Sequence, residues 1–264
     1  MIDSHVHVWP AGQRHPAQIG PVTLAATADD LEATLQSAAV RAAVVFQPSI
    51  SDEQTYLRSV SDLPIARYAR AIRWAAPAAG ASSKLEALAG QGVRGIRLDL
   101  VSPVAEHSVD DLAAICRAAG EQGMVVDWLA RPDRLGIVDL IARRLPALIQ
   151  VVDHLGLPGD PTDRAELGLV VSLALHPGVH IKLSGLHAIS KLSSPYADCR
   201  MWVHEIVSAF GGERVMWGSN WPLSIEFESY RALIDLPLGD GTLPDSVWSE
   251  TAERVWFSNA SAGH

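Results

Sequence analysis

The chain has 264 residues, of which 48% are hydrophobic and 19% charged, with a mean hydropathy of +0.13. This is a globular composition, and the length fits a single α/β barrel, so we expect one domain over residues 1–264. A net charge of −9 and the lack of any lysine or arginine cluster argue against a nucleic-acid partner. No apolar run reaches the roughly 20 residues that span a bilayer, and no signal peptide is evident. We expect a cytoplasmic protein with a small-molecule substrate, no membrane partner, and an oligomeric state left open.

Short apolar runs alternate with longer helical patterns from one end of the chain to the other. The predicted strands are 2–8, 42–46, 66–74, 95–100, 125–129, 149–153, 180–184 and 215–218. The predicted helices are 29–39, 52–60, 82–91, 109–122, 133–145, 163–175 and 196–210, with a last helix over 246–256. Strands that alternate with helices indicate βαβ units and a parallel sheet.

A doubly wound open sheet is the structural alternative to a closed barrel. Such a sheet normally has a glycine-rich turn after its first strand, whereas this chain reads His5-Val6-His7-Val8-Trp9-Pro10 there. No dinucleotide or phosphate-loop motif is present. The sequence therefore favours an α/β fold of the (β/α)₈ TIM-barrel type, with its site at the carboxyl ends of the strands.

Polar side chains gather at those strand ends. His5 and His7 are two residues apart on the first strand and so point to the same face. Further candidates follow the second, fourth, sixth, seventh and eighth strands: Ser49, Arg97, His154, Ser184, His187 and Asn220. Trp128 and Trp221 suit either a pocket wall or the core. Because the carboxyl ends of barrel strands meet at one rim, we expect the polar residues to share one pocket.

Several other residues have a simpler structural interpretation. We expect Lys182 to pair with a core carboxylate, and Asp99 and Asp153 to orient Arg97 or a histidine. Surface or loop positions are expected for the remaining histidines: His15, His107, His176, His180, His204 and His264. His15 lies in the first loop, where the alternative to solvent exposure is a cap over the pocket. Cys116 and Cys199 are far apart and in no metal-binding spacing, so buried, inert thiols are expected.

Six short motifs, taken in order, resemble the amidohydrolase-2 family. They are Asp3-Ser4-His5-Val6-His7, Gln47-Pro48-Ser49, Arg94-Gly95-Ile96-Arg97, Asp153-His154-Leu155-Gly156, Lys182-Leu183-Ser184-Gly185 and Trp217-Gly218-Ser219-Asn220-Trp221-Pro222. The resemblance is to its lactonase branch, which includes pyrone-dicarboxylate hydrolase, sugar-acid lactonases and galactarolactone isomerase. It runs from residue 2 to about residue 222 and independently implies the barrel.

The chain also departs from that family pattern. The last motif ordinarily carries an Asp where this chain has Asn220, and an amide is neither a base at neutral pH nor a good metal ligand. Galactarolactone isomerase shares the Asn but does not keep both histidines of the first strand. Leu157 and Ala188 stand where pyrone-dicarboxylate hydrolases have carboxylate-binding arginines, which argues against a dicarboxylate. His187 is either a substitute acid or base or a structural hydrogen-bonding group.

The resemblance and the residues together predict an amidohydrolase-superfamily enzyme that hydrolyses a small cyclic ester without a metal cofactor. Arg97 and the His5, His7 and His154 cluster would polarise the carbonyl, and Asn220 would orient water. Ser49, Trp128, Ser184 and Trp221 would contact the substrate, and His187 would carry protons. One alternative is a lactone isomerase, in which a substrate hydroxyl replaces water. Another is a zinc hydrolase or decarboxylase with Zn²⁺ on His5, His7 and His154, and a third is a barrel that only binds ligand.

Overall fold

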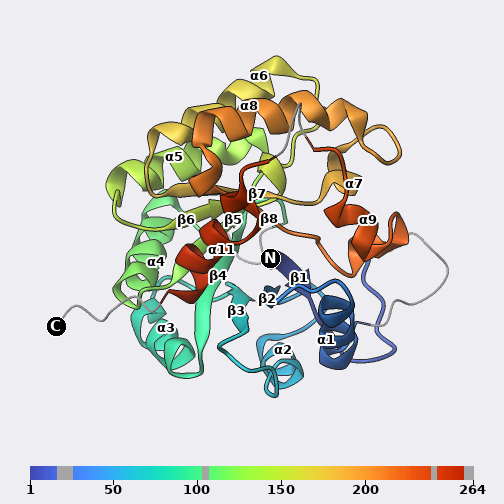
Figure 1. Ribbon diagram of the computed structural model, residues 1–264. Helices are drawn as coiled ribbons and strands as arrows, with labels where there is room; N and C mark the ends of the chain where they lie inside the picture. The colour runs from blue at the N-terminus through green and yellow to red at the C-terminus, as the bar shows by residue number, and fades with distance from the viewer. Residues whose placement is uncertain (17–25, 103–106, 239–242, 259–264) are drawn as a thin grey trace.

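The computed structural model describes residues 1–16, 26–102, 107–238 and 243–258. Its eight parallel strands pair in sequence order: β1 (Ile2–His7), β2 (Ala42–Phe46), β3 (Tyr68–Arg73), β4 (Val93–Asp99), β5 (Val125–Leu129), β6 (Gln150–Val152), β7 (Val179–Leu183) and β8 (Val215–Trp217). Closure comes just beyond β8, where the His7 amide donates to the Trp221 carbonyl at 2.8 Å and the Asn220 amide to the His5 carbonyl at 2.9 Å. The helices ring the strands in Figure 1, which confirms the predicted (β/α)₈ barrel.

The predicted helices appear in the expected order, and the structure adds two short α-helices, one after β7 and one after β8, that were not predicted. The α-helices are α1 (Ala28–Ser37), α2 (Glu53–Ser59), α3 (Ala81–Gly90), α4 (Val109–Glu121), α5 (Leu135–Arg144), α6 (Arg164–Ser172), α7 (Leu186–Ile189), α8 (Arg200–Phe210), α9 (Tyr230–Ile234), α10 (Asp245–Trp248) and α11 (Glu250–Ala252). Side-chain caps start several of them. In α4, for example, the Ser108 hydroxyl accepts from the Asp111 amide while the Asp111 carboxylate accepts from the Ser108 amide, a reciprocal capping box.

Two predicted helices differ from the structure. The last helix, expected over 246–256, breaks at Ser249 (φ −155°, ψ −53°) into α10 and α11, and a π-helical turn over Glu253–Phe257 follows. The helix expected to begin at 196 begins instead at Arg200, because Tyr196 has a φ of +56° and a 3₁₀ turn intervenes. Such breaks depend on tertiary packing and leave no periodic signal in the sequence.

Side chains along each strand point alternately outward and inward, which produces two apolar cores, one between the strands and the helices and one inside the barrel. Outward-pointing residues such as Val45 and Val126 pack against the helices. A smaller cluster, including Phe46, Met216 and Trp256, fills the barrel interior. Gly95 lines this interior, and the position requires a glycine because an added Cβ would lie 2.7 Å from the Trp256 ring. The apolar plug leaves the carboxyl-end half of the interior for polar side chains.

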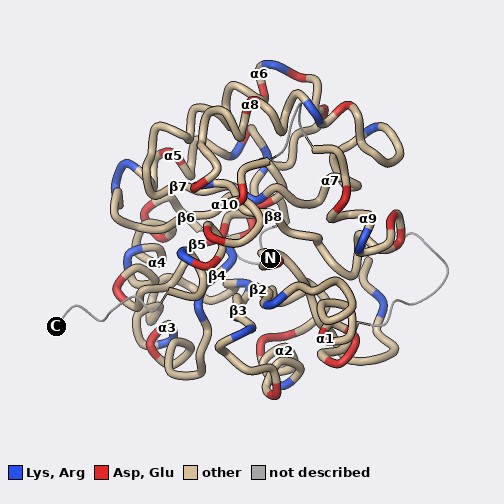
Figure 2. The backbone as a smooth tube through the Cα atoms, in the orientation of Figure 1, with Lys and Arg blue, Asp and Glu red and all other residues tan. Residues whose placement is uncertain are grey.

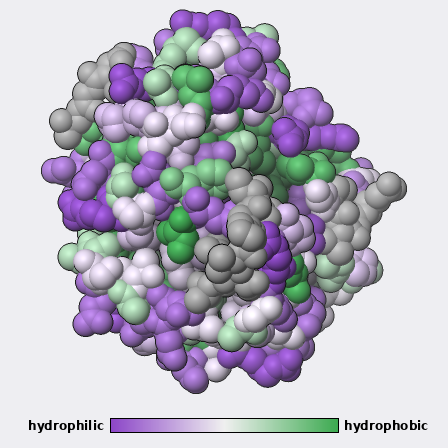
Figure 3. All heavy atoms as spheres, turned by 90° about the vertical axis from the view of Figure 1, so that its right-hand side faces the viewer, coloured by the Kyte–Doolittle hydropathy of each residue, from purple (hydrophilic) through white to green (hydrophobic). Residues whose placement is uncertain are grey.

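The outer surface carries charges of both signs. Acidic and basic residues are interspersed around the ring of helices in Figure 2. The face in Figure 3 is mostly hydrophilic, with small hydrophobic patches between the polar side chains. Among the described residues, no helix has the length and apolarity to cross a membrane.

Candidate active site

A layer of buried charges lies inside the barrel where β4 to β7 end. Arg97 pairs through Nε with Asp127 at 3.0 Å and through Nη2 with Asp153. Lys182 pairs with the same two carboxylates, at 2.5 Å and 2.8 Å respectively. Buried ions require partners of opposite charge, and this layer holds two of each sign. Lys182 thus pairs with core carboxylates as predicted, and Asp153 orients Arg97.

The pKa values of the two carboxylates in this layer are shifted in opposite directions. Burial alone would raise the pKa of Asp153, but Arg97 and Lys182 outweigh burial and hold that pKa well below its usual range. Burial raises the pKa of Asp127 to about 7, and the negative charge of Asp153 acts in the same direction. Asp153 is therefore the stronger acid of the two and is ionised beneath the site.

His5 lies directly on this charged layer. Its Nδ1 is 3.3 Å from Asp153 Oδ1 and 3.3 Å from Lys182 Nζ, and its ring stacks on Phe46 with centroids 4.7 Å apart. Burial lowers the pKa of His5 well below its usual value, so the ring is neutral at pH 7. Because His5 is fully buried, it contacts the polar layer rather than the cavity above.

His7 has both ring nitrogens engaged within the protein. Nδ1 lies 2.9 Å from the Phe46 carbonyl oxygen, which can only accept, so Nδ1 carries the proton. Nε2 is then the acceptor and lies 3.2 Å from His5 Nε2. Burial lowers the pKa of His7 well below its usual value. His7 therefore fixes the orientation of His5 and offers a ligand only its carbon edge.

His154 is the histidine whose ring nitrogen is available to a ligand. Its Nδ1 lies 2.8 Å from Ser184 Oγ, and no described residue hydrogen bonds to its Nε2. Burial lowers the pKa of His154 to about 3, so it too is neutral at pH 7. The Ser184 hydroxyl can donate or accept, so it fits either tautomer of the ring. His154 can accordingly act as a donor or as a base at Nε2.

A cavity of about 280 Å³ opens above these residues at the carboxyl ends of the strands. It is lined by His7, His15, Gln47, Ser49, Arg73, Arg97, Asp99, Ser102, Leu129, His154, Asn220 and Leu223. Five residues predicted from the sequence are among them: His7, Ser49, Arg97, His154 and Asn220. The lining is polar apart from two leucines, which suits a small hydroxylated ligand.

Asn220 and His187 form a pair at one side of the cavity. The Asn220 amide Nδ2 lies 3.5 Å from His187 Nε2, an orientation that leaves the Asn220 Oδ1 to accept from a ligand or water. His187 does not line the cavity, and its ring stacks on Phe227 with centroids 4.9 Å apart. Burial lowers the pKa of His187 to about 4. His187 therefore contacts the cavity only through Asn220.

Three residues predicted to contact the substrate do not line this cavity. Trp128 is corrected outright: Asp127 points into the barrel, so alternation directs Trp128 outward, where its Nε1 donates to Gln150 at 2.9 Å. Trp221 is 1% exposed and belongs to the outer core. Ser184 lies behind His154 and acts on the cavity through that ring.

Two histidines expected at the surface are placed otherwise. His180 is 4% exposed, with Nδ1 3.2 Å from the Gly178 carbonyl oxygen at the amino end of β7. His15 is partly buried, lines the cavity and bonds Ser49 Oγ through Nε2 at 3.1 Å. Arg73 also lines the cavity and was not predicted from the sequence. Inward alternation at the carboxyl end of β3 is the signal that would have found it.

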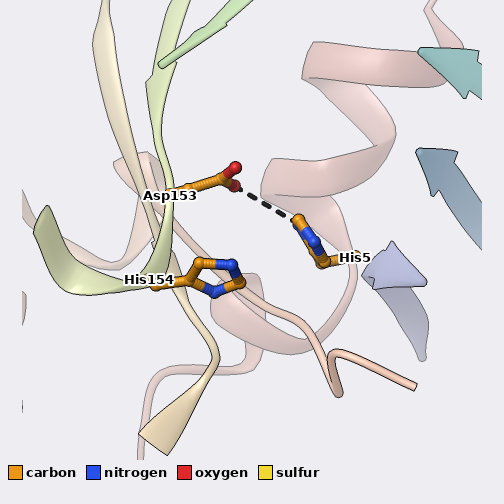
Figure 4. Close-up of side chains that lie close together, drawn as sticks. All are labelled: His5, Asp153 and His154. Atoms are coloured by element: carbon orange, nitrogen blue, oxygen red, sulfur yellow. Dashed lines mark ion pairs between the residues drawn. The ribbon is translucent and has the colours of Figure 1, made fainter. Parts of the chain in front are cut away.

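A group of ligand atoms in the site has the composition of a metal centre. His5, Asp153 and His154 each offer one atom, all within 4.8 Å of one another (Figure 4). The histidines predicted as zinc ligands were His5, His7 and His154, so the structure puts Asp153 in place of His7. By atom type and spacing this group could hold a metal ion. Its carboxylate, however, already pairs with Arg97 and Lys182.

The sequence matches the family model described as amidohydrolase over residues 2–257, and the chain belongs to this amidohydrolase family. It is an amidohydrolase-superfamily enzyme with relatives that act on lactones. It is 30% identical over 241 residues to L-fucono-1,5-lactonase of Burkholderia ambifaria, covering 84% of this chain and 80% of the relative. It is 28% identical over 172 residues to D-galactarolactone isomerase of Agrobacterium fabrum, covering 62% and 56%.

Solved structures have the same fold. A putative 2-pyrone-4,6-dicarboxylic acid hydrolase from Pseudomonas putida superposes with a TM-score of 0.76 at 23% identity, covering 97% of this chain and 96% of that one. An amidohydrolase from Burkholderia multivorans with bound zinc superposes with a TM-score of 0.73 at 23% identity, covering 97% and 98%. Similarity at this level establishes the barrel and leaves the substrate and metal to be argued from the site.

Proposed function

We propose that the enzyme hydrolyses a small cyclic ester, a lactone, in the cavity at the carboxyl ends of the strands. The observation that carries this proposal is the convergence of Arg97, His154 and Asn220 on one cavity of about 280 Å³. They supply a cationic donor, a neutral imidazole and an amide that can hold water. The similarity to an L-fucono-1,5-lactonase supports a lactone as the substrate class.

Arg97 is the group suited to stabilise the oxyanion of ester hydrolysis. Its Nε and Nη2 are committed to Asp127 and Asp153, which hold the guanidinium in place. Its Nη1 bonds to no group in the described part of the chain and is left for a ligand oxygen. A donor fixed before the reaction stabilises developing negative charge without reorganisation, and one such donor is typically worth about 10²–10³ in rate.

His154 is the proposed base. Water held by Asn220 Oδ1 attacks the lactone carbonyl and gives its proton to His154 Nε2, while Arg97 stabilises the oxyanion. Burial, Arg97 and Lys182 hold the pKa of His154 at about 3, so the imidazolium forms only in passing, and the nearby Asp153 charge offsets part of its cost. Collapse of the tetrahedral intermediate breaks the ring C–O bond, and the proton on Nε2 passes to the departing alkoxide. The products are one carboxylic acid and one hydroxyl on the same molecule.

We further propose that this reaction uses no resident metal ion. Arg97 Nη2 lies 3.3 Å from His5 Nδ1 and 3.2 Å from His5 Nε2, and Lys182 Nζ lies 3.3 Å from Nδ1. Two cations thus surround the ring that a metal would need, and both also pair with Asp153. A divalent ion there would meet strong repulsion. Zinc analysis of protein purified without chelator, with activity before and after chelation, tests this point.

Lactone isomerisation is the second candidate, favoured by Asn220. The amide can hold a substrate hydroxyl in the place of water, and that hydroxyl would give its proton to His154 Nε2 as it attacks the carbonyl. D-Galactarolactone isomerase is among the relatives of this chain. The two reactions differ in whether solvent oxygen enters the product.

A lactone panel tests the proposed function. We expect wild-type protein to open at least one small lactone, and His154→Ala to lower kcat/KM by about 10²–10³. His204→Ala removes an exposed histidine of α8 and serves as the matched control, with activity close to wild type. Circular dichroism verifies that both variants are folded. Wild-type turnover that His154→Ala leaves intact would remove His154 from the mechanism.

A further inference from the structure

An ion pair that the proposed chemistry does not use lies in the wall of the cavity. Arg73 ends β3 and Asp99 ends the neighbouring β4, and both line the cavity. Arg73 Nη2 lies 2.8 Å from Asp99 Oδ2, with side-chain exposures of 19% and 7%. Neither residue belongs to the buried layer beneath His5. The pair is therefore available to determine which substrates bind.

The geometry of the pair is fixed from both sides. Asp99 Oδ1 accepts from the backbone amides of Val101 at 2.9 Å and Ser102 at 2.7 Å, so only Oδ2 faces Arg73. Arg73 Nη2 donates its second hydrogen to the Ser102 carbonyl at 2.7 Å. Both hydrogens of that nitrogen are consequently used within the protein. Arg73 Nε and Nη1, in contrast, have no hydrogen-bond acceptor among the described residues.

The cavity lining carries no uncompensated positive charge in the described residues. Arg73 is matched by Asp99, and Arg97 shares the carboxylates of Asp127 and Asp153 with Lys182. The segments outside the described residues contain no lysine or arginine in the sequence and supply no further cation. The hydroxyl and amide groups of the cavity lining, in contrast, can hydrogen bond to the hydroxyls of a sugar-like ring. Burying an unmatched carboxylate in such a lining is costly.

We propose that the Arg73–Asp99 pair makes the cavity select uncharged, hydroxylated lactones and reject lactones that bear a carboxylate. Asp99 masks a carboxylate-binding site on Arg73, because an incoming anion meets the repulsion of Asp99 together with the attraction of Arg73. This inference rests on the proposed lactonase function and adds the charge of the substrate. Rejection of a competing ligand by a fixed like charge is a general route to specificity.

Asp99→Asn tests the proposal with little change in shape. The substitution removes the negative charge. The Asn Oδ1 can still accept from the amides of Val101 and Ser102, while the Asn Nδ2, a donor, faces the Arg73 guanidinium without bonding to it. The substrates are two δ-lactones that differ only in one ring substituent, a hydroxymethyl group or a carboxylate. We expect the kcat/KM ratio, carboxylate over hydroxymethyl, to rise about 10-fold or more, since a freed guanidinium gains a charge-assisted bond.

Three variants serve as controls. Glu253→Gln removes the same charge from another arginine pair, Arg41–Glu253 at 2.6 Å, beside the amino end of β2, and is expected to leave the ratio unchanged. Arg73→Gln combined with Asp99→Asn is expected to lose the gain. Arg73→Gln alone leaves Asp99 unpaired and is expected to lower the ratio below that of wild type. This last variant keeps the test decisive if Asp99→Asn does not fold.

A binding measurement separates this inference from the proposed function. The probes are the two unreactive δ-lactams that correspond to the two lactones, titrated by calorimetry. Wild-type protein is expected to bind the hydroxymethyl lactam more tightly, and Asp99→Asn to shift the Kd ratio toward the carboxylate by about 10-fold or more. Equal or tighter carboxylate binding by wild type, or no shift in either variant, would overturn the inference. The expected shift without turnover of any lactone would overturn only the proposed function.

Discussion

Asn220 lies at a position where the residue type determines the chemistry that is possible. It adopts a φ of +61°, a region that Asn tolerates better than most residues, and its Nδ2 faces His187 Nε2. As an amide it orients His187 and water without changing the charge of the site. A carboxylate of nearly the same size would add a negative charge beside two neutral imidazoles. Charge at residue 220 is thus the variable that distinguishes this site from the family pattern.

We predict that Asn220→Asp raises the pKa of His187 from about 4, by roughly one to three units, because a nearby anion favours the imidazolium. The variant should also gain affinity for divalent metals, since a carboxylate joins the imidazoles. Histidine NMR titration and zinc calorimetry measure the two effects. Asn220→Ala is the control and should show neither. A folded Asn220→Asp protein with an unchanged His187 pKa would mean that the two side chains do not interact.

The turn from β7 into α7 positions His154 through a glycine. Gly185 has a φ of +67°, which L side chains rarely adopt, and a Cβ there would lie 2.6 Å from His154 Nδ1. The neighbouring Ser184 holds the same nitrogen by a hydrogen bond of 2.8 Å. His154 itself has a φ of +50°, a conformation that is strained for a residue with a side chain, and the turns after β6 and β7 meet at this proposed base. The turn from β7 into α7 can hold the His154 imidazole in this position only if residue 185 has no side chain.

Gly185→Ala is therefore expected to displace the His154 ring, lower kcat by 10-fold or more, and cost about 1–3 kcal/mol of unfolding free energy. Gly168→Ala in α6, where an added Cβ meets nothing within 4 Å, is the matched control. That change should stabilise the helix by about 0.5–1 kcal/mol and leave kcat unchanged. Kinetics and urea unfolding of both variants make the comparison. Full activity in Gly185→Ala would show that the turn does not restrain His154.

At the scale of the whole molecule, buried neutral histidines link folding stability to pH. His180 lies at the amino end of the barrel, away from the cavity, and burial lowers its pKa to about 4. The unfolded chain takes up this proton near pH 6.5, so between about 6.5 and 4 it binds more protons than the folded state. Stability is then fully present above pH 6.5 and is lost as pH falls through this window. His187, with its pKa also about 4, acts in the same direction.

His180→Gln should flatten this dependence. We expect the slope of unfolding free energy against pH between 6.5 and 5 to decrease by up to about 1.4 kcal/mol per pH unit, the value for one proton. His204→Gln, at an exposed position of α8, should leave the slope unchanged. Urea unfolding at several pH values in the window supplies the data. Equal slopes for His180→Gln and wild type would mean that His180 is protonated in the folded protein.

The barrel was predictable because alternating strands and helices encode it directly, and so was the rim where polar strand ends meet. Individual placements were less accessible. The sequence left Trp128 open between pocket wall and core, because the inward direction of its strand depends on Asp127 pairing with Lys182, a contact between residues 55 positions apart. His5 was predicted at the cavity surface, yet it lies below it. The pairing of β1 with β2 shifts register between Asp3 and Val6, next to His5, and no sequence pattern predicts that shift. Cytoplasmic location stays a prediction.

Turnover of an uncharged, hydroxylated δ-lactone in H₂¹⁸O, with chelator-treated protein, tests the central claim most directly. Hydrolysis through Arg97, His154 and Asn220 predicts one solvent ¹⁸O in the product carboxylate, at a rate that chelation leaves unchanged. A reaction without enzyme corrects for spontaneous opening. An isomeric lactone without ¹⁸O would contradict hydrolysis, and activity that chelation abolishes and zinc restores would contradict the metal-free site.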